Sequence, residues 1–151
     1  MSHWLQGKMV NLKCSLAKLR EAIINIMPEW EGHMEISQDG SLAIHSSHTG
    51  ETKTGYHIRV PENSTLGIRY CDFGVKQLSD GTWHIQYDSG GLPTAIRNAP
   101  GALKDEVSAM RTKEIAKQNG IQVMEEDKSR NGIRQRLRMT PDQIENFVQQ
   151  L

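Results

Sequence analysis

The chain has 151 residues, of which 18 are acidic and 18 are basic, so its formal net charge is zero. Balanced charge argues against a dedicated nucleic-acid-binding or membrane-surface protein, because such proteins usually carry a basic excess. A chain of this length can bury about 70% of its unfolded surface, so residues 1–151 can fold as a single domain without a metal or a disulfide.

Cys14 and Cys71 are the only cysteines, and we expect both to be reduced, since two distant thiols do not make a disulfide framework. Residues 1–14 contain no apolar run typical of a signal peptide, and no later segment is apolar for long enough to span a membrane. These features favour a cytoplasmic protein that contacts no membrane and needs no cofactor.

The N-terminal segment predicts a strand followed by a helix. Residues 3–10 alternate loosely between apolar and polar, and Asn11 or Ser15 can cap the helix that follows. Apolar residues then recur at helical spacing and form one stripe for burial. The stripe consists of Leu12, Leu16, Leu19, Ile23 and Ile26. Pro28 ends the helix at Met27.

The next segment predicts short strands. Residues 34–44 indicate a hairpin, because Asp39-Gly40 is a strong turn signal between two short apolar runs. Residues 45–54 are polar and predict an exposed loop. Residues 56–60 alternate as a strand that Pro61 stops.

The stretch from Gly67 to Asp88 is the richest in strand-forming residues and predicts the central hairpin of the fold. Its turn is at Asp80-Gly81, a second strong hairpin signal. The alternation slips before Phe73, so we expect a β-bulge near Asp72 or a break at Gly74. Three residues follow the turn at period two and should be buried against the first helix. They are Trp83, Ile85 and Tyr87.

The C-terminal third predicts a helix over residues 102–119, a hairpin around Asn131-Gly132, and a closing helix that begins at the Thr-Pro-Asp-Gln capping box of residues 140–143. Side-chain parity constrains the hairpin register. A two-residue turn at Asn131-Gly132 would place Val123 on the face of the arginines that follow the turn. We therefore expect a register shifted by one residue, an odd number of loop residues, and Gly132 at positive φ.

The predicted order of elements is β-α-β-β-β-β-β-α-β-β-α. Consecutive hairpins imply a mainly antiparallel sheet with helices packed on one face. The predicted fold class is therefore α+β, and a ferredoxin-like split arrangement is the named topology nearest to this order.

A polar face of the predicted sheet is the candidate binding site. If the apolar residues of each strand point inward, their polar neighbours share the outer face. The residues of this face are His57, Arg59, Arg69, His84, Gln86 and Asp88. Arg59 and Arg69 together can hold an anionic group, because guanidinium donors match phosphate and carboxylate geometry. The alternative is an ordinary solvated face on which arginine and aspartate pair across strands.

No catalytic motif is visible, since the chain has no Walker loop, no GxSxG and no CxxC. His45 and His48 form a close pair, but a zinc site is not expected without a cysteine or carboxylate beside them. Gly90-Gly91 could approach a phosphate, although a turn that leaves a strand is the commoner explanation. We predict no metal site and no catalytic residue.

Arginines alternate along the last predicted strand, at positions 134, 136 and 138. They could touch the phosphates of a nucleic acid. Glu126, with Glu125 as a second candidate, can neutralise part of this stripe from the facing strand, and no aromatic residue is interleaved for stacking. A nucleic-acid partner is therefore not expected.

Several short motifs resemble a family of short uncharacterised proteins, encoded in cyanobacteria, plastids and other bacteria, that typically begin Met-Ser-His-Phe. The motifs are Met1-Ser2-His3-Trp4, Leu16 with Leu19, Gly55-Tyr56-His57-Ile58, Asp72-Phe73-Gly74-Val75, Asp80-Gly81-Thr82-Trp83, Asn119-Gly120, Glu125-Glu126 and Asn131-Gly132. Trp4 replaces the usual phenylalanine, and residues 89–100 do not match. The family has no established activity, so the resemblance implies a fold and adds no catalytic residue.

Three functions are compatible with these observations. The first is a non-enzymatic binding protein that holds an anionic small molecule, such as a nucleotide-type signal, on the polar face and the loop of residues 89–100. The second is an accessory subunit that docks a protein partner or another copy of the chain. The third is a small enzyme with His57, His84 and Asp88 in acid–base roles, and it ranks last because no catalytic constellation is visible.

Overall fold

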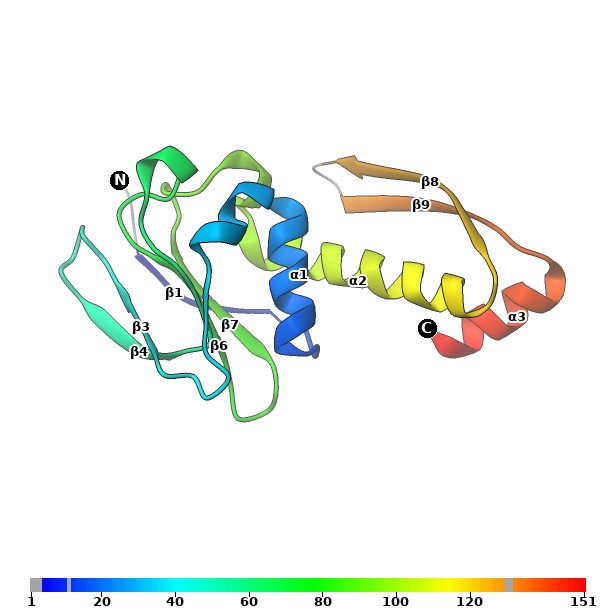
Figure 1. Cartoon of the computed structure of the whole chain (residues 1–151), viewed down its shortest axis with the longest axis horizontal. Helices are drawn as coiled ribbons and strands as arrows, with labels where there is room; N and C mark the ends of the chain where they lie inside the picture. Colours follow the sequence, from blue (N-terminus) through cyan, green and yellow to red (C-terminus); the bar gives the residue numbers. More distant parts are fainter. Residues whose placement is uncertain (1–3, 11, 130–131) are drawn as a thin grey trace. The chain divides into compact units, whose positions relative to one another are not determined.

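The computed structural model describes residues 4–10, 12–129 and 132–151 (Figure 1). The chain divides into two compact units, Met1–Lys104 and Asp105–Leu151, and the boundary falls inside the helix α2 (Ala99–Gln118). The single α+β domain expected over residues 1–151 stays a prediction.

A five-stranded sheet with the strand order β1-β7-β6-β5-β2 forms the frame of the first unit (Figure 1). Its strands are β1 (Trp4–Val10), β2 (Glu35–Ile36), β5 (Ile58–Val60), β6 (Phe73–Gln77) and β7 (Trp83–Asp88). All neighbouring pairs are antiparallel, so the predicted α+β class with an antiparallel sheet is confirmed. The ferredoxin-like option is wrong, because β5, β6 and β7 form a meander and no split β-α-β pair of parallel strands is present in the described residues.

One face of this sheet is apolar, and α1 (Leu16–Ile26) belongs to that side. The Ser15 hydroxyl caps α1 by accepting a hydrogen bond from the Lys18 N–H, and Met27 is the C-cap, so the predicted helix ends are confirmed. The indole N–H of Trp83 donates to the Cys14 carbonyl at 3.0 Å, which joins β7 to the start of this helix. Trp83, Ile85 and Tyr87 are buried as predicted.

A separate hairpin covers the other face of the sheet. It consists of β3 (Leu42–His45) and β4 (Thr52–Tyr56). A Cβ added to Gly74 of β6 would lie 2.7 Å from Cγ2 of Ile44 and 2.9 Å from Cδ1 of Tyr56, so this hairpin packs directly on the sheet backbone. In Figure 1, β6 and β7 accordingly lie between α1 and the β3–β4 hairpin.

The predicted hairpin over residues 34–44 is wrong, because its two strands join different sheets. β2 pairs with β5, whereas β3 pairs with β4. The turn itself is present, since the Ser37 hydroxyl donates to Asp39 and accepts from the Ser41 N–H. The predicted loop over residues 45–54 is partly strand: it contains the connection between β3 and β4, but also the last residue of β3 and the first three residues of β4.

The chain changes direction at His57, between β4 and β5. Tyr56 therefore packs over Gly74 on one face, while Ile58, which pairs with Val75, lies on the opposite face. His57 points to the apolar side, where its ring meets Trp83 edge-on with centroids 5.7 Å apart. Its Nδ1 accepts a hydrogen bond from the Gln77 N–H, so His57 does not join the predicted polar face.

The predicted bulge near Asp72 is replaced by a break at Tyr70. Among the described residues, Tyr70 is the one non-glycine at positive φ, with a value of 75°. Its carbonyl accepts hydrogen bonds from the His48 N–H and from the hydroxyls of Ser46 and Ser47. These contacts hold the strained backbone in place, and β6 starts only afterwards at Phe73.

The second unit contains the remainder of α2 from Asp105 on, the hairpin of β8 (Gln122–Ser129) and β9 (Gly132–Arg138), and α3 (Pro141–Gln150). The capping box of α3 is confirmed, since the side chains of Thr140 and Gln143 each bond the other's backbone N–H. The core of this unit consists of Ile115, Ala116, Ile121 and Phe147, with Val123, Leu137 and Met139 packed against it.

The register of β8 and β9 places Val123 opposite Leu137, and Gly132 has a φ of 116°, as predicted. An extra residue sets the parity, because the register shifts by one between Val123 and Glu125. The predicted odd number of loop residues is wrong, because Ser129 pairs directly with Gly132; the bulge at Met124 shifts the parity instead. The loop residues 130–131 lie outside the described residues.

Candidate anion-binding site

The six predicted site residues do not form one solvent-exposed face. Gln86 and Asp88 are only 1% and 2% exposed. Gln86 is buried because the β3–β4 hairpin covers this side of β7, and Lys53 of β4 donates to its side-chain oxygen at 3.4 Å. The alternation of side chains along β7 predicts the correct side of the sheet for Gln86. It does not predict that the β3–β4 hairpin covers that side.

Arg59 is half-buried and belongs to an ion-pair cluster with one buried carboxylate, Asp72, and one exposed carboxylate, Glu35. Its Nε donates to Oδ2 of Asp72 at 2.9 Å, and its Nη1 donates to Glu35. Asp72 is buried and also accepts the backbone N–H groups of His45 and Glu62, both at 2.8 Å. The prediction that Arg59 holds an anionic ligand is therefore corrected, because two carboxylates already compensate its charge.

Arg69 is held by its backbone, where its N–H donates to the Gly91 carbonyl at 3.0 Å. A Cβ on Gly91 would lie 2.1 Å from the Arg69 carbonyl oxygen, so Gly90-Gly91 is a tightly packed turn that leaves β7. Arg59 and Arg69 contact different partners, Asp72 and Glu35 for the first and Gly91 for the second, so the arginine pair is not the centre of the site.

Two lysines join His84 and Gln86 on the face that the hairpin covers. Lys76 of β6 lies opposite His84 in the strand register, and Lys53 reaches over from β4. The Lys76 ammonium stands 5.5 Å from the centre of the Tyr56 ring, a cation–π distance that fixes its direction. We call Lys53, Lys76, His84 and Gln86 the lysine–histidine cluster.

Strand alternation in the sequence predicts His84 and Gln86 as site residues, but neither lysine was among the predicted residues. Lys53 falls in the segment predicted to be a loop. The position of Lys76 could have been predicted from the sequence. It is two residues from Gly74, so both lie on the same side of β6 and Lys76 shares the polar face.

The electrostatics of the lysine–histidine cluster are set by burial and by positive charge. Burial lowers the pKa of His84, and the charges of Lys76 and Lys53 lower it further. The imidazole is therefore neutral near pH 7. Its Nε2 is buried and has no hydrogen-bond partner among the described residues. A buried polar atom without a partner is costly, so a ligand that reaches Nε2 gains a favourable contact.

Replacing either lysine by methionine should raise the pKa of His84 toward its ordinary value of about 6.5, because each ammonium disfavours the imidazolium. Histidine ring signals followed by NMR against pH give this value directly. Lys13→Met, which removes an exposed lysine, is the matched control. An unchanged His84 titration in both cluster variants would contradict the assignment.

The same lowered pKa fixes the sign of the pH dependence of stability. Acid protonates His84 in the unfolded chain before it does so in the folded chain, so the folded state loses stability as the pH falls below about 6.5. Above that pH the contribution of His84 is fully present.

Asp88 and Cys71 form a buried pair that is not a reactive site. Oδ1 of Asp88 accepts the Gly90 N–H at 2.8 Å, and Oδ2 has no partner among the described residues. Burial, followed by the charges of Asp88, Asp72 and Glu62, raises the pKa of Cys71 to about 12. The thiol is therefore protonated at neutral pH and a poor nucleophile. Cys14 and Cys71 are both free, as expected.

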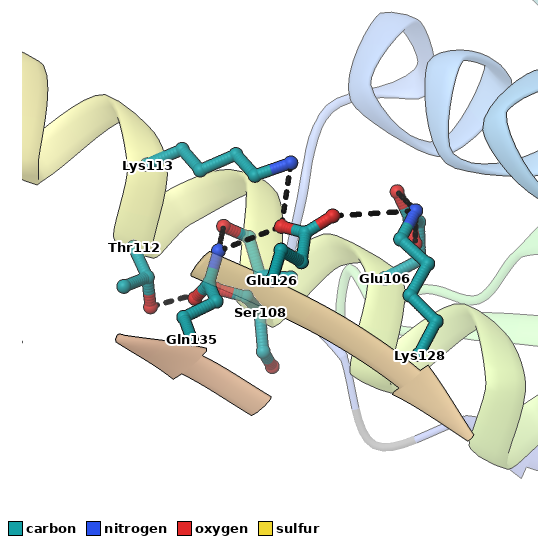
Figure 2. Close-up of polar contacts among 8 residues, drawn as sticks. Glu106, Ser108, Thr112, Lys113, Glu126, Lys128 and Gln135 are labelled. Atoms are coloured by element: carbon teal, nitrogen blue, oxygen red, sulfur yellow. Dashed lines mark hydrogen bonds and ion pairs between the residues drawn. The ribbon is translucent and has the colours of Figure 1, made fainter. Parts of the chain in front are cut away.

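The second unit contains another polar cluster, between α2 and the β8–β9 hairpin (Figure 2). Lys113 lies 2.6 Å from Glu126, and Lys128 bridges Glu126 to the buried Glu106. Burial would raise the pKa of Glu126, but hydrogen bonds from Lys113 and Gln135 and the charges of both lysines bring it below its ordinary value. The charges alternate in sign along this chain of contacts, so the cluster fastens the hairpin to the helix and needs no ligand.

The described residues contain no group of three or more His, Cys, Asp or Glu side chains that could hold a metal ion. Within the same residues, no helix combines the length and apolarity needed to cross a membrane. The chain matches no protein-family model, no curated protein and no solved structure. Membership of the Met-Ser-His-Phe family accordingly stays a proposal that rests on the motifs.

Proposed function

We propose that the protein binds an anionic small molecule at the lysine–histidine cluster. The observation that carries this proposal is the buried, unpartnered Nε2 of His84 beside two lysines whose charges both act on it. Lys53 and Lys76 supply positive charge, and an Nε2–H supplies a directed hydrogen bond. An oxyanion satisfies all three groups, since it accepts hydrogen bonds and offsets the repulsion between the two ammoniums.

The site favours a compact oxyanion such as a phosphate or carboxylate. Gln86 orients Lys53 through a hydrogen bond to its side-chain oxygen, and the Tyr56 ring orients Lys76. Both lysines are thus held before a ligand arrives, which reduces the side-chain entropy lost on binding. This differs from the predicted Arg59–Arg69 site in its residues, and it keeps the predicted class of ligand.

Titration of the full-length protein with inorganic phosphate tests the proposal. Phosphate should shift the His84 ring signals and raise the pKa of His84, because a bound anion favours the imidazolium. In Lys53→Met/Lys76→Met the apparent affinity should fall at least about tenfold. Lys13→Met should bind as the parent does. The same titration with ATP asks whether the anionic group is recognised within a nucleotide.

Two outcomes would reject the proposal. One is an unchanged affinity in the double lysine variant, which would place binding elsewhere. The other is binding that leaves the His84 signals unmoved, because the proposed ligand lies against its Nε2.

The acid–base enzyme hypothesis finds less support. His57 is bonded to the Gln77 N–H on the apolar side of the sheet. Asp88 is four positions from His84 along β7, which separates them by about 13 Å on an extended strand. These three groups do not converge on one reacting atom.

The accessory-subunit hypothesis has a separate observation in its favour. Exposed aliphatic side chains recur on one side of α3 and at the chain end that follows it. They are Ile144, Val148 and Leu151, with exposed fractions of 46%, 62% and 62%. Apolar residues at this spacing are typical of helices that dock into a partner, and this function stays a prediction.

A further inference from the structure

We propose that the open edge of β9 accepts an extended segment of a partner protein, with acidic side chains at alternate positions, as a third strand of the β8–β9 sheet. The inference is independent of anion binding by the lysine–histidine cluster, because it concerns only residues of the second unit.

The backbone of β9 is available along one edge. Among the described residues, β9 pairs with β8 alone, and the backbone of residues 133–138 makes no hydrogen bond to any other part of the chain that the structure describes. Alternate residues of an edge strand direct their N–H and C=O groups outward, where an added strand can bond to them. The edge of β8 is less suitable, because the bulge at Met124 interrupts its regular spacing.

The outer face of β9 selects the charge of the partner. Arg134, Arg136 and Arg138 all lie on this face and are exposed. Their opposite residues on β8 are Asp127, Glu125 and Gln122. Arg136 and Glu125 lie 4.0 Å apart with side chains 79% and 68% exposed, so this pair is loose and leaves the guanidinium able to contact a second carboxylate.

The hairpin itself therefore shows which residue type pairs well with these arginines. Carboxylates face two of them from the β8 side, and a third strand would add carboxylates from the other side, where opposite charges across strands stabilise a sheet. Hollows of about 480 Å³ and 270 Å³ lie among these side chains. Their lining includes all three arginines.

The inner side of β9 favours particular side chains at the partner positions that lie between the acidic residues. A hollow of about 150 Å³ lies there, against α2. It is lined by Asp105, Ser108, Ala109, Thr112, Ile133 and Gln135. Side chains of an added strand alternate between the two faces, so every second residue would point toward this hollow. Small hydroxyl side chains suit it, whereas a carboxylate would face Asp105.

Two other occupants fit less well. In an antiparallel pair of β9 strands from two copies, arginine would lie opposite arginine, and like charges across strands are destabilising. A nucleic acid would find no aromatic residue of β9 on which a base could stack. The alternation of charge and size favours a peptide strand.

The test is fluorescence anisotropy of the full-length protein with a labelled, end-blocked peptide of sequence Thr-Glu-Thr-Glu-Thr-Glu-Thr. A control peptide has the same composition in blocks, Glu-Glu-Glu-Thr-Thr-Thr-Thr. A second control is the alternating peptide with alternate amides N-methylated. We expect the alternating peptide to bind at least tenfold tighter than both controls, and hydrogen exchange to slow at the outward amides of β9.

Variants locate the site. Arg136→Gln should weaken binding of the alternating peptide several-fold, whereas Lys117→Gln, which removes an exposed charge from α2, should not. Arg136→Glu should lose the parent peptide and gain the one whose central glutamate is lysine, a reversal that a misfolded variant cannot produce. Equal binding of the block peptide, by simple attraction of a polyanion, would overturn the proposal. So would failure of the alternating peptide to bind, or unchanged exchange in β9.

Discussion

Trp83→Ala is expected to lower the free energy of unfolding by about 3–5 kcal/mol, the usual range for removing a buried aromatic side chain. Trp83 is 1% exposed, and three kinds of contact depend on it. Its ring fills the apolar side of the sheet, its edge meets His57, and its indole N–H satisfies the Cys14 carbonyl at the start of α1. The substitution therefore leaves both a cavity and an unsatisfied carbonyl.

Urea unfolding followed by circular dichroism measures this effect. Trp83→Phe is the matched control, because it keeps an aromatic ring and removes the indole donor, so its cost should be clearly smaller. A loss below about 1 kcal/mol for Trp83→Ala would mean that the side chain does not fill a core site, since that is the range of ordinary substitutions.

Asp72→Ala is the second substitution with a large expected effect, also about 3–5 kcal/mol, because it breaks a buried charge pair by removing one partner. Asp72 accepts the Arg59 guanidinium and two backbone N–H groups, from His45 and Glu62. These donors connect β3, β5 and the segment after β5 to one carboxylate. All of them lose their acceptor together.

The double variant Asp72→Ala/Arg59→Met distinguishes the charge from the backbone contacts. It should cost less than the sum of the two single substitutions, because it no longer leaves a half-buried guanidinium that has lost the buried one of its two carboxylate partners. Asp127→Ala, which removes an exposed carboxylate, should change the free energy of unfolding far less. Strict additivity of the two single effects would show that Arg59 and Asp72 are not coupled.

The elements that could be predicted from the sequence are those that local contacts determine. The Ser15 cap, the end of α1 before Pro28 and the capping box at Thr140 each depend on residues within four positions of one another. The central hairpin was equally predictable, because Asp80-Gly81 lies between strands that pair with each other.

The prediction of strand pairing was wrong where the two partner strands are distant in the sequence. Asp39-Gly40 correctly indicated a turn, but a turn signal does not state that its two flanking strands pair with each other. β2 found its partner in β5, across the whole β3–β4 hairpin. Only the burial of both sheet faces decides this choice, and burial is a property of the assembled fold.

Two of the four residues of the lysine–histidine cluster could be predicted from the sequence, because only contacts within one strand follow from local pattern. Alternation placed His84 and Gln86 on one side of β7, and the structure keeps them there. It could not reveal that the β3–β4 hairpin lies over this side and brings Lys53 with it. Parity also failed at His57, because the rule holds within one strand and the chain bends between β4 and β5.

The close packing of Gly74 under Ile44 and Tyr56 restricts which substitutions this part of the sequence can accept, and in which order. A methyl group at position 74 would collide with Cγ2 of Ile44, so no other residue fits while that isoleucine is present. The two positions should therefore change together, with Gly74→Ala tolerated only after Ile44 has become smaller and the Tyr56 ring, whose Cδ1 would lie 2.9 Å from the new Cβ, has moved into the space released. In a library that randomises both positions, selection for folding should recover such pairs and reject the single change, which makes the order of mutation matter.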